Sequence, residues 1–380
     1  MKIVTAIDSF KGSLNTFQSG AAVSRAANAV FPEALTDVCP LADGGEGTVD
    51  AIISANGGGI IKVKVHDPLY RIIDSSYGYV EKTKTAVIEM ATASGITLVS
   101  EEERNPLNTT TYGVGELISD ALSRGAERFI VGIGGSATND GGVGMLQALG
   151  FEFYTKNGQA IPYGAQGLEF LSEIRTENAD KRLLNCEFLV ACDVKNTLCG
   201  ELGCSAVYGP QKGATPEMIK NMDVWLENYA DLTKKLLPKS DKDFEGAGAA
   251  GGLGFALMSY LGARLTSGIE LVIKETSLEE HIKDADIVVT GEGRLDSQSC
   301  MGKAPVGVAK LAKKYGKLVL AFSGCATDDA ELCNEYGIDA FFPILRVPST
   351  LSEAMDVRNA EKNLEATARQ AFLLVKALTK

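Results

Sequence analysis

Residues 128–142 read RFIVGIGGSATNDGG, so an apolar, partly β-branched run leads directly into a glycine-rich loop. The run 128–133 predicts a buried β-strand, and a short helix is expected over 143–149 after the loop. In open α/β sheets, ligands bind in the crevice at the carboxyl ends of the strands. This stretch therefore predicts a strand–loop–helix unit whose loop approaches a ligand.

The same arrangement recurs along the chain, because other polar or glycine-rich loops also follow apolar runs. These loops are 8–12 (DSFKG), 43–48 (DGGEGT), 193–196 (DVKN), 209–213 (GPQKG) and 291–296 (GEGRLD). Glycine lets a backbone approach a ligand closely, and the neighbouring acids and hydroxyls can hold a metal or move a proton. The pattern predicts an enzyme that acts on a small molecule and handles phosphate.

Both ends of the chain alternate between strand and helix patterns. Strands are expected over 3–7, 36–40, 286–289, 318–322 and 340–343, and helices over 16–30, 47–55, 306–315, 329–336 and 359–378. The stretches 60–65, 75–80 and 86–90 instead look like consecutive strands with no room for helices between them.

The economical architecture is an α/β protein with two domains. A parallel-sheet, Rossmann- or flavodoxin-like domain is built from residues 1–65 and 283–380, and a mixed-sheet α/β domain, 66–282, is inserted into it. The active site is expected in the cleft between the two domains.

Residues typical of helix caps and turns predict further elements. A helix is expected over 113–122, a strand over 187–191, and a helix from the Thr215-Pro216 cap to about 237. Lys156-Asn157-Gly158 predicts a hairpin turn between strands 151–154 and 159–161. Two capping boxes are expected, Asp328 with Glu331 and Thr350 with Glu353.

Composition excludes several classes of function. The formal net charge is −12 and we find no basic run long enough for a nucleic-acid footprint or an anionic membrane surface. The negative net charge does not exclude an anionic substrate. Salt screens surface charges beyond about 8 Å, so a few nearby cations can decide binding in a cleft. The uncharged stretch 246–263 contains six glycines, so it predicts a turn and a buried helix over 255–261 and not a membrane span.

The cysteines and histidines do not suggest a zinc site. The eight cysteines contain no C-x-x-C pair, and His66 and His281 each stand alone. Buried structural thiols in a reducing cytosol are the simpler interpretation. The chain enters a strand directly after Met1 without the features of a signal peptide, so a cytoplasmic location is expected.

Two glycine patterns raise an alternative, an NAD-dependent hydroxy-acid dehydrogenase. The G-x-G-x-x-G at 246–251 follows mostly charged residues and no strand, so its context fails. The looser G-x-G-x-x-A at 132–137 follows a strand and has Glu152 about twenty residues on. The intervening 138–142 weakens this alternative, because it delays the helix that should receive a pyrophosphate. The chain has no Walker A sequence.

Structural explanations compete with functional ones for single residues. Asp43 and Glu46 have the spacing of a capping box, Asp140 could cap the helix at 143, and Lys11 could be a solvated loop lysine. Asp193 directly follows an apolar strand, so a functional role is favoured for it. A non-catalytic small-ligand regulator is a further alternative, although its acidic loop residues would then be unnecessary.

Six motifs carry a resemblance to a known family. They are DSFKGSL (8–14), PLADGGEGT (40–48), GIGGSATNDGG (132–142), YGPQKGA (208–214), GAGAAGGLG (246–254) and TGEGRLDSQ (290–298). In this order and over nearly the whole chain, the sequence resembles the bacterial glycerate kinases, the two-domain α/β type without a Walker A motif.

The resemblance implies phosphorylation of D-glycerate by ATP with Mg²⁺ in a soluble cytoplasmic enzyme. The product 2-phosphoglycerate is favoured, and 3-phosphoglycerate is the alternative. The partners implied are small molecules, D-glycerate and ATP, with neither nucleic acid nor membrane. Oligomeric state stays open.

Residue roles follow as hypotheses. The loop residues expected to bind the nucleotide phosphates are Gly134, Gly135, Ser136, Thr138, Asn139 and Asp140. The expected metal ligands are Asp43, Asp193 and Asp296, since Mg²⁺ prefers carboxylates with water and phosphate oxygens.

The remaining roles concern the acceptor and the chemistry. Arg294, and next Lys11, would bind the glycerate carboxylate, with Ser9 and Gln298 as further substrate ligands. The expected catalytic residues are Asp193 as general base, Lys212, which would neutralise the transferring group, and Lys11.

Overall fold

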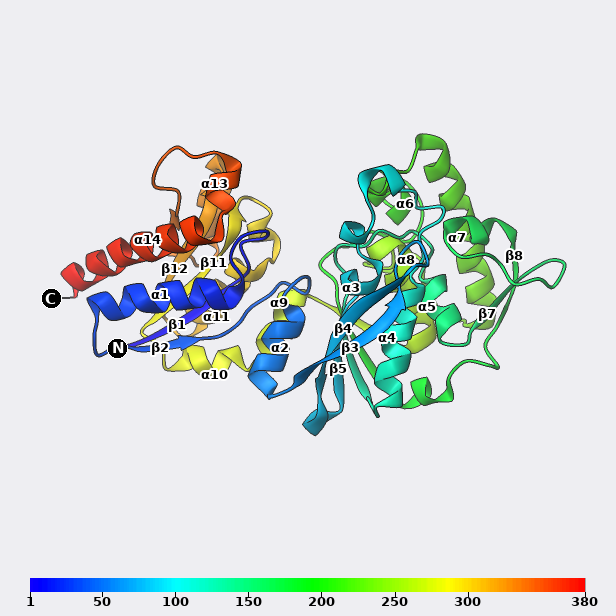
Figure 1. Ribbon diagram of the computed structural model, residues 1–380, viewed down its shortest axis with the longest axis horizontal. Helices are drawn as coiled ribbons and strands as arrows, with labels where there is room; N and C mark the ends of the chain where they lie inside the picture. Colours follow the sequence, from blue (N-terminus) through cyan, green and yellow to red (C-terminus); the bar gives the residue numbers. More distant parts are fainter. Residues whose placement is uncertain (380) are drawn as a thin grey trace. The chain divides into compact units, whose positions relative to one another are not determined.

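The computed structural model describes residues 1–379, and the chain divides into two compact units. Unit 1 consists of Met1–Gly57 and the chain from Ser267 onward, and unit 2 is Gly58–Thr266 (Figure 1). These boundaries lie earlier in the chain than the expected 65/66 and 282/283. The strand starting at Gly59 pairs with a unit 2 strand, and the helix starting at Gly268 packs in unit 1.

Unit 1 contains a parallel sheet in the order β13-β12-β11-β1-β2. Its strands are β1 (Lys2–Ile7), β2 (Leu35–Val38), β11 (Ile287–Leu295), β12 (Leu318–Ala326) and β13 (Ala340–Pro343). The parallel pairing places Ile3 opposite Ile287, and Val288 opposite Val319. All carboxyl ends therefore lie along one edge of the sheet, as the Rossmann-like prediction requires.

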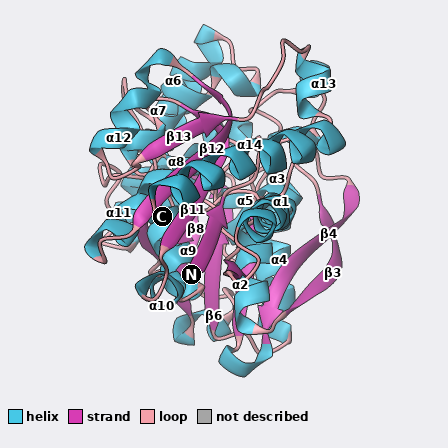
Figure 2. Ribbon diagram, turned by 90° about the vertical axis from the view of Figure 1, so that its left-hand side faces the viewer, coloured by secondary structure: helices cyan, strands magenta, loops and turns pink. Residues whose placement is uncertain are grey.

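Helices cover both faces of this sheet (Figure 2). They are α1 (Thr16–Val30), α2 (Thr48–Asn56), α9 (Gly268–Glu275), α10 (Leu278–Lys283), α11 (Ala304–Lys314), α12 (Leu332–Glu335), α13 (Leu351–Met355) and α14 (Val357–Leu378). The alternation of the strands separates the two cores. Ile3 and Ile7 pack with α1 and α14, whereas Val4 and Ala6 pack with α9, α10 and α11.

Of the two capping boxes predicted from the sequence, one forms and one does not. The capping box of Thr350 with Glu353 is confirmed, since each backbone N–H is accepted by the other's side chain. The box expected for Asp328 and Glu331 is wrong. The chain there forms a 3₁₀ turn over Asp328–Glu331 with Thr327 at its N-cap, and α12 begins only afterwards.

Unit 2 contains a mixed sheet in the order β10-β9-β6-β5-β4-β3. Its strands are β3 (Gly59–His66), β4 (Ile72–Val80), β5 (Thr85–Glu89), β6 (Arg128–Gly132), β9 (Glu187–Ala191) and β10 (Arg264–Thr266). The pairs β3–β4 and β4–β5 are antiparallel, and β5–β6, β6–β9 and β9–β10 are parallel. The predicted mixed sheet is confirmed.

The helices of unit 2 pack around one apolar core. They are α3 (Ala91–Ser94), α4 (Tyr112–Ser123), α5 (Val143–Ala148), α6 (Cys204–Tyr208), α7 (Pro216–Leu236) and α8 (Ala249–Leu261). Phe129 and Phe188 belong to this core and stack on each other, with ring centroids 4.6 Å apart. In the described residues 1–379, no helix combines the length and apolarity needed to cross a bilayer.

The expected hairpin forms a short contact, in which the Thr155 N–H donates to the Gln159 carbonyl oxygen at 2.8 Å and the Ile161 N–H to that of Phe153 at 3.0 Å, but its first strand has a further partner. The strand β7 (Glu152–Thr155) pairs antiparallel with β8 (Leu171–Arg175), and the segment 159–161 contributes a single bridge, Tyr154 to Ala160. The turn at Lys156-Asn157-Gly158 does form, with the Gly158 N–H donating to the Thr155 carbonyl oxygen. The local turn could be predicted from the sequence, but the pairing of β7 with β8 could not.

Candidate active site

In unit 1, acidic side chains gather at the carboxyl edge of the parallel sheet. Asp8 follows β1 and Asp43 follows β2, while Glu292 lies near the end of β11 and Asp296 directly after it. The sheet order places β1 between β11 and β2, so residues far apart in the sequence meet here. The Asp8 N–H donates to the Gly291 carbonyl oxygen at 2.9 Å, which fixes the start of the Asp8 loop against β11.

Asp8 and Glu292 carry perturbed carboxyl groups. The pKa of Asp8 is raised from 3.8 to about 8, chiefly by burial and also by the Asp43 and Glu292 carboxylates, while the Ser9 N–H and Lys11 act to lower it. Burial likewise raises the pKa of Glu292, whose Oε1 accepts a hydrogen bond from the Ser299 hydroxyl. The sequence-based set of site residues omitted both, although each lies inside a quoted motif.

The cations predicted to bind substrate lie on the same edge and are exposed. The Lys11 ammonium is 3.9 Å from Asp43 Oδ2, and Arg294 Nε is 3.3 Å from Asp296 Oδ2. Gln298 is also exposed, and its N–H donates to Asp296 Oδ1. Unit 1 thus brings together Lys11, Asp43, Arg294 and Asp296.

Buried hydroxyl groups without a partner accompany these residues. The Oγ atoms of Ser9 and Ser323 are inaccessible to solvent and make no hydrogen bond. Ser323 lies opposite Glu292 in the β11–β12 register. Because unpaired buried polar atoms cost free energy, this edge is suited to a polar ligand.

The structure does not support a capping role for Asp43. The N-cap of α2 is Gly47, which has φ 93° and no side-chain capping bond. Asp43 Oδ1 instead accepts from the Gly45 N–H at 3.2 Å, closing a local turn that leaves Oδ2 facing Lys11. The Asp43 carboxylate is therefore held after the end of β2 and does not cap α2.

In unit 2, the glycine-rich loop after β6 lies over a buried lysine. Lys212 is only 2% exposed, and its ammonium donates to Ser136 Oγ at 2.8 Å and to the Thr138 carbonyl oxygen at 2.6 Å. Burial lowers the Lys212 pKa from 10.5 to about 8. The predicted phosphate loop and the predicted catalytic lysine are thus in direct contact, while Gly134 and Gly135 at the loop's start are exposed.

Asp140 anchors the other end of this loop. Its Oδ2 accepts from the Thr111 N–H and Oγ1, both at 2.8 Å, and from the Gly144 N–H at 3.2 Å. Its Oδ1 accepts from the Gly142 N–H at 3.1 Å. The simple capping interpretation therefore explains part of its role, since Asp140 bonds to the first turn of α5 while also tying the loop to the start of α4.

The glycine-rich segment 246–254 packs closely against the loop 134–142. Ala250, Gly251 and Gly252 have left-handed backbone angles at the start of α8, and the Gly141 N–H donates to the Gly251 carbonyl oxygen at 2.9 Å. A Cβ on Gly251 would lie 2.1 Å from the Thr138 carbonyl oxygen. This glycine pattern thus serves close packing between backbones, and α8 begins earlier than the expected 255.

Two polar atoms of the loop have no partner within the protein. Thr138 Oγ1 and Asn139 Oδ1 are buried and make no hydrogen bond, although Asn139 Nδ2 donates to Ser205 Oγ at 2.8 Å. Together with the exposed glycines, these atoms fit the predicted contact with an oxygen-rich ligand.

Asp193 lies where the sequence predicts, directly after β9, and is exposed. Its neighbour Lys195 forms an exposed ion pair with Glu245 at 3.3 Å, and Asn196 Oδ1 accepts from the Tyr208 hydroxyl at 2.6 Å. The three expected metal ligands are divided between the units, with Asp43 and Asp296 in unit 1 and Asp193 in unit 2.

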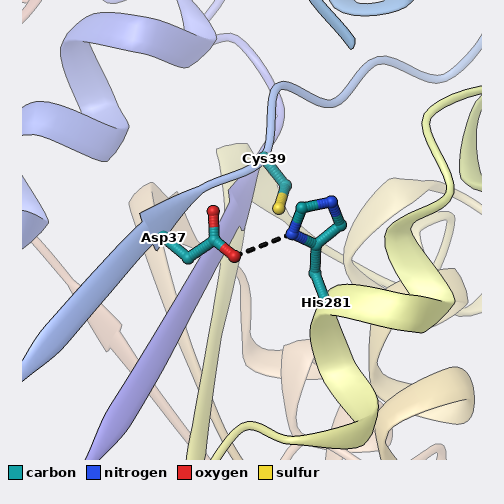
Figure 3. A group of neighbouring side chains, drawn as sticks. All are labelled: Asp37, Cys39 and His281. Carbon is teal, nitrogen blue, oxygen red and sulfur yellow. Dashed lines mark hydrogen bonds and ion pairs between the residues drawn. The ribbon is translucent and has the colours of Figure 1, made fainter.

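A separate cluster of possible metal ligands lies at β2 and α10 (Figure 3). Asp37, Cys39 and His281 each place a ligand atom within 4.8 Å of the others, so His281 is not as isolated as the sequence suggested. Two of these groups, Asp37 and His281, already have partners. His281 Nδ1 is hydrogen-bonded to Asp37 Oδ2 at 2.7 Å, and the Lys2 ammonium lies 3.7 Å from the same oxygen. The arrangement is a polar contact between β2 and α10.

Comparison with known proteins identifies the relatives of this chain. The model of the glycerate kinase family matches residues 3–376. The chain is 49% identical to glycerate 2-kinase of Escherichia coli over 97% of its length and 98% of the relative, and 47% identical to glycerate kinase of Haemophilus influenzae over 97% of both.

A solved structure shares the fold as well. The crystal structure named as a glycerate kinase 2 from Salmonella typhimurium LT2 aligns with a TM-score of 0.91 and 46% identity, covering 100% of this chain and 99% of the other. The dehydrogenase interpretation is therefore replaced by the kinase. On the family match and these near full-length identities, the chain belongs to the glycerate kinase family.

Proposed function

We propose that this ATP-dependent kinase transfers the γ-phosphoryl group of ATP to the 2-hydroxyl of D-glycerate, giving 2-phosphoglycerate and ADP. Family membership supports the reaction class and the acceptor. The relative from E. coli, 49% identical, is named a glycerate 2-kinase, which favours the 2-hydroxyl. The observation that carries the proposal is the contact of the buried Lys212 ammonium with the loop of Ser136 and Thr138.

The loop 134–142 would bind the phosphates of ATP. Backbone N–H groups in glycine-rich loops form concave sites for anions, and Gly134 and Gly135 are exposed for this purpose. Lys212 places a positive charge against the same loop. The Asp140 carboxylate accepts hydrogen bonds that hold the loop in place, so it would not contact the ligand itself. Asp140 is thus a positioning residue, which modifies the direct phosphate contact expected from the sequence.

The acidic edge of unit 1 would hold Mg²⁺. Mg²⁺ typically takes one or two protein carboxylates and fills its other positions with water and substrate phosphate. Asp43 with Asp8 and Glu292 offers this donor set, and a divalent cation would compensate for the burial and the mutual repulsion that raise the pKa values of Asp8 and Glu292. Asp296 and Asp193 remain candidate ligands from the sequence. The ion would neutralise charge on the transferring phosphoryl group.

The glycerate carboxylate would bind to cations of unit 1. Arg294 is exposed at the end of β11 and presents a planar guanidinium suited to a carboxylate. Lys11 lies on the neighbouring Asp8 loop, and the Ser9 hydroxyl is an unpaired polar group on the same loop. Gln298 adds an exposed amide nearby in the sequence.

A general base must accept the proton of the attacking hydroxyl. Asp193 is proposed for this role because its carboxylate lies at the end of β9 and is exposed to an incoming substrate. Lys11 and Lys212 would balance the charge that develops on the transferred group. Because ATP is the donor, we place the enzyme in the cytoplasm.

Phosphorus NMR tests the proposal directly. The purified chain is incubated with ATP, MgCl₂ and D-glycerate, and the coupled spectrum separates 2- from 3-phosphoglycerate. A 2-phosphoglycerate signal that requires D-glycerate and disappears with EDTA is expected. A 3-phosphoglycerate signal would contradict the acceptor position, undiminished turnover with EDTA would contradict the metal, and no phosphorylated acid would contradict the substrate.

A further inference from the structure

Two cysteines of unit 1 that are far apart in the sequence lie side by side. Cys300 belongs to the 3₁₀ turn Ser299–Met301, and Cys333 belongs to α12. Their Sγ atoms are 3.3 Å apart, although 33 residues separate them in the chain. A disulfide has an S–S distance of about 2.05 Å. Closing the remaining gap therefore needs a movement of only roughly 1.3 Å, which is within reach of side-chain rotation.

The pair adjoins the polar loop at the end of β11. The residue before Cys300, Ser299, donates its hydroxyl to Glu292 and accepts the Asp296 N–H at 3.2 Å. Cys333 Sγ itself lies 4.0 Å from the Asp296 carbonyl oxygen. A bond between the two sulfurs would therefore tie the loop that begins at Asp296 to α12.

Access to the two thiols is unequal. Cys333 is fully buried, whereas Cys300 is partly exposed. An oxidant from solvent would meet Cys300 first, and Cys333 would then attack the modified sulfur from within the protein. This order is that of a peroxidatic or exchanging thiol next to a resolving thiol.

We propose that Cys300 and Cys333 form a reversible disulfide that lowers kinase activity by restraining the loop at Asp296; the effect on activity rests on the proposed function. With a small disulfide such as oxidised glutathione, the Cys300 thiolate attacks one glutathione sulfur and releases one glutathione thiolate. The Cys333 thiol, whose pKa is raised by burial, then loses its proton as it attacks the Cys300 sulfur of the mixed disulfide and releases the second glutathione thiolate. Two protein thiols lose two electrons and two protons, and one glutathione disulfide becomes two glutathione molecules.

Peptide mapping tests the bond without any assay of turnover. The full chain is incubated with excess oxidised glutathione, remaining thiols are alkylated, and the digest is analysed by mass spectrometry. A linked pair of peptides containing Cys300 and Cys333 is expected, and it should vanish after dithiothreitol. Glutathione on Cys300 with Cys333 still alkylated, or unmodified thiols on both, would overturn the proposal.

Activity measurements then test the consequence. Kinase activity of the linked protein should fall by about tenfold to a hundredfold and return with dithiothreitol, since displacing a positioning group by 1 Å costs up to about 10²-fold. Cys333→Ser should prevent both the link and the slow loss of activity that follows it. Cys325→Ser, which removes an exposed thiol of the same unit, should respond as the unaltered protein does.

The two proposals fail in different ways. Quantitative linkage with unchanged turnover would overturn the regulatory role of the bond. A reduced protein without activity on D-glycerate would contradict the proposed function, while the peptide map would still decide whether the disulfide forms. Cys300→Ser gives a second variant in case Cys333→Ser folds poorly, because Cys300 is less buried.

Discussion

At the residue scale, the fold holds two ionisable side chains away from water, Asp8 after β1 and Lys212 in the 3₁₀ turn Pro210–Lys212. Lys212 and Asp8 are each 2% exposed, and burial shifts the pKa of each toward neutrality from opposite directions. Groups with pKa values near working pH are typical of functional sites. The burial of these two side chains could not be predicted from the sequence, because buried and solvated glycine-rich loops have similar compositions.

Replacing Lys212 by Met should lower kcat by about 10²- to 10³-fold, the cost of removing one fixed charge-stabilising donor. The thermal midpoint should change little, because the buried ammonium itself carries a desolvation cost. Steady-state kinetics with saturating ATP and D-glycerate measure the effect. Lys220→Met, at an exposed lysine of α7, is the matched control. A kcat within threefold of the unaltered chain would contradict the role of Lys212.

Replacing Asp193 by Asn should lower kcat by about 10²- to 10⁴-fold, since general bases contribute that much. The amide keeps the size of the side chain but cannot accept the hydroxyl proton. Asp231→Asn, at an exposed position of α7, provides the control for losing one negative charge. A loss of less than tenfold would show that another group takes the proton.

Asp8 should make stability depend on pH. Its pKa is about 8 in the folded chain and 3.8 in the unfolded chain, so the folded state retains a proton that the unfolded state releases. Its contribution to stability is therefore complete below pH about 4 and is lost as the pH rises to about 8, by up to about 1.4 kcal/mol per pH unit.

Urea unfolding in EDTA at several pH values measures this effect. Asp8→Asn lacks the titrating proton, so its free energy of unfolding should rise relative to that of the unaltered chain between pH 5 and 8. Parallel pH dependence in the two proteins would mean that Asp8 is not protonated in the folded state.

At the element scale, most helices and strands follow from local patterns. The helix expected over 16–30 is α1 (Thr16–Val30), because apolar residues recur with helical spacing and Asn15 with Gln18 forms a capping box. The strand at 318–322 extends to Ala326, since pairing with β11 continues beyond the apolar run. Where the sequence failed, as for β8, the decisive contacts come from residues distant in the chain.

The contact between α8 and the loop 134–142 can be tested with a pair of glycines. Gly251 and Gly262 both have left-handed angles, φ 68° and 63°, but only Gly251 faces backbone, since a Cβ added there would lie 2.1 Å from the Thr138 carbonyl oxygen. Gly262→Ala should cost about 1–2 kcal/mol of stability from backbone strain alone, without loss of activity. Gly251→Ala should cost more and should also raise the KM for ATP.

Urea unfolding and ATP-dependent kinetics distinguish these outcomes. The steric clash in Gly251→Ala displaces Thr138, so the loop and the Lys212 contact should shift together. Equal stability and equal KM values in the two variants would indicate that the close approach of the backbones is unimportant.

At the scale of the whole molecule, each unit buries its own apolar core. The core of unit 2 is built from residues between Val65 and Ala263, and the two cores of unit 1 draw on both ends of the chain. Unit 2 is continuous in sequence, so it has what a separate domain requires. Both units carry candidate site residues, and neither has the full set.

A fragment spanning Gly58–Thr266 should therefore fold on its own. Circular dichroism should show native-like secondary structure and a cooperative thermal transition, because the core of unit 2 is complete within the fragment. Phosphoryl transfer to D-glycerate should be absent, because Asp8, Asp43 and Arg294 lie outside it. Gradual, non-cooperative melting would show that the fragment depends on the rest of the chain.

The sequence by itself determined the order and type of most elements, the presence of a parallel and a mixed sheet, and the family, because periodicity and glycine-rich motifs are local properties of a chain. Only the tertiary structure decided that Lys212 lies buried against Thr138, that Asp8 joins Asp43 and Glu292, and that Cys300 meets Cys333. The physical reason is that desolvation and contact distance depend on neighbours supplied by other strands and helices, which no short stretch of sequence specifies.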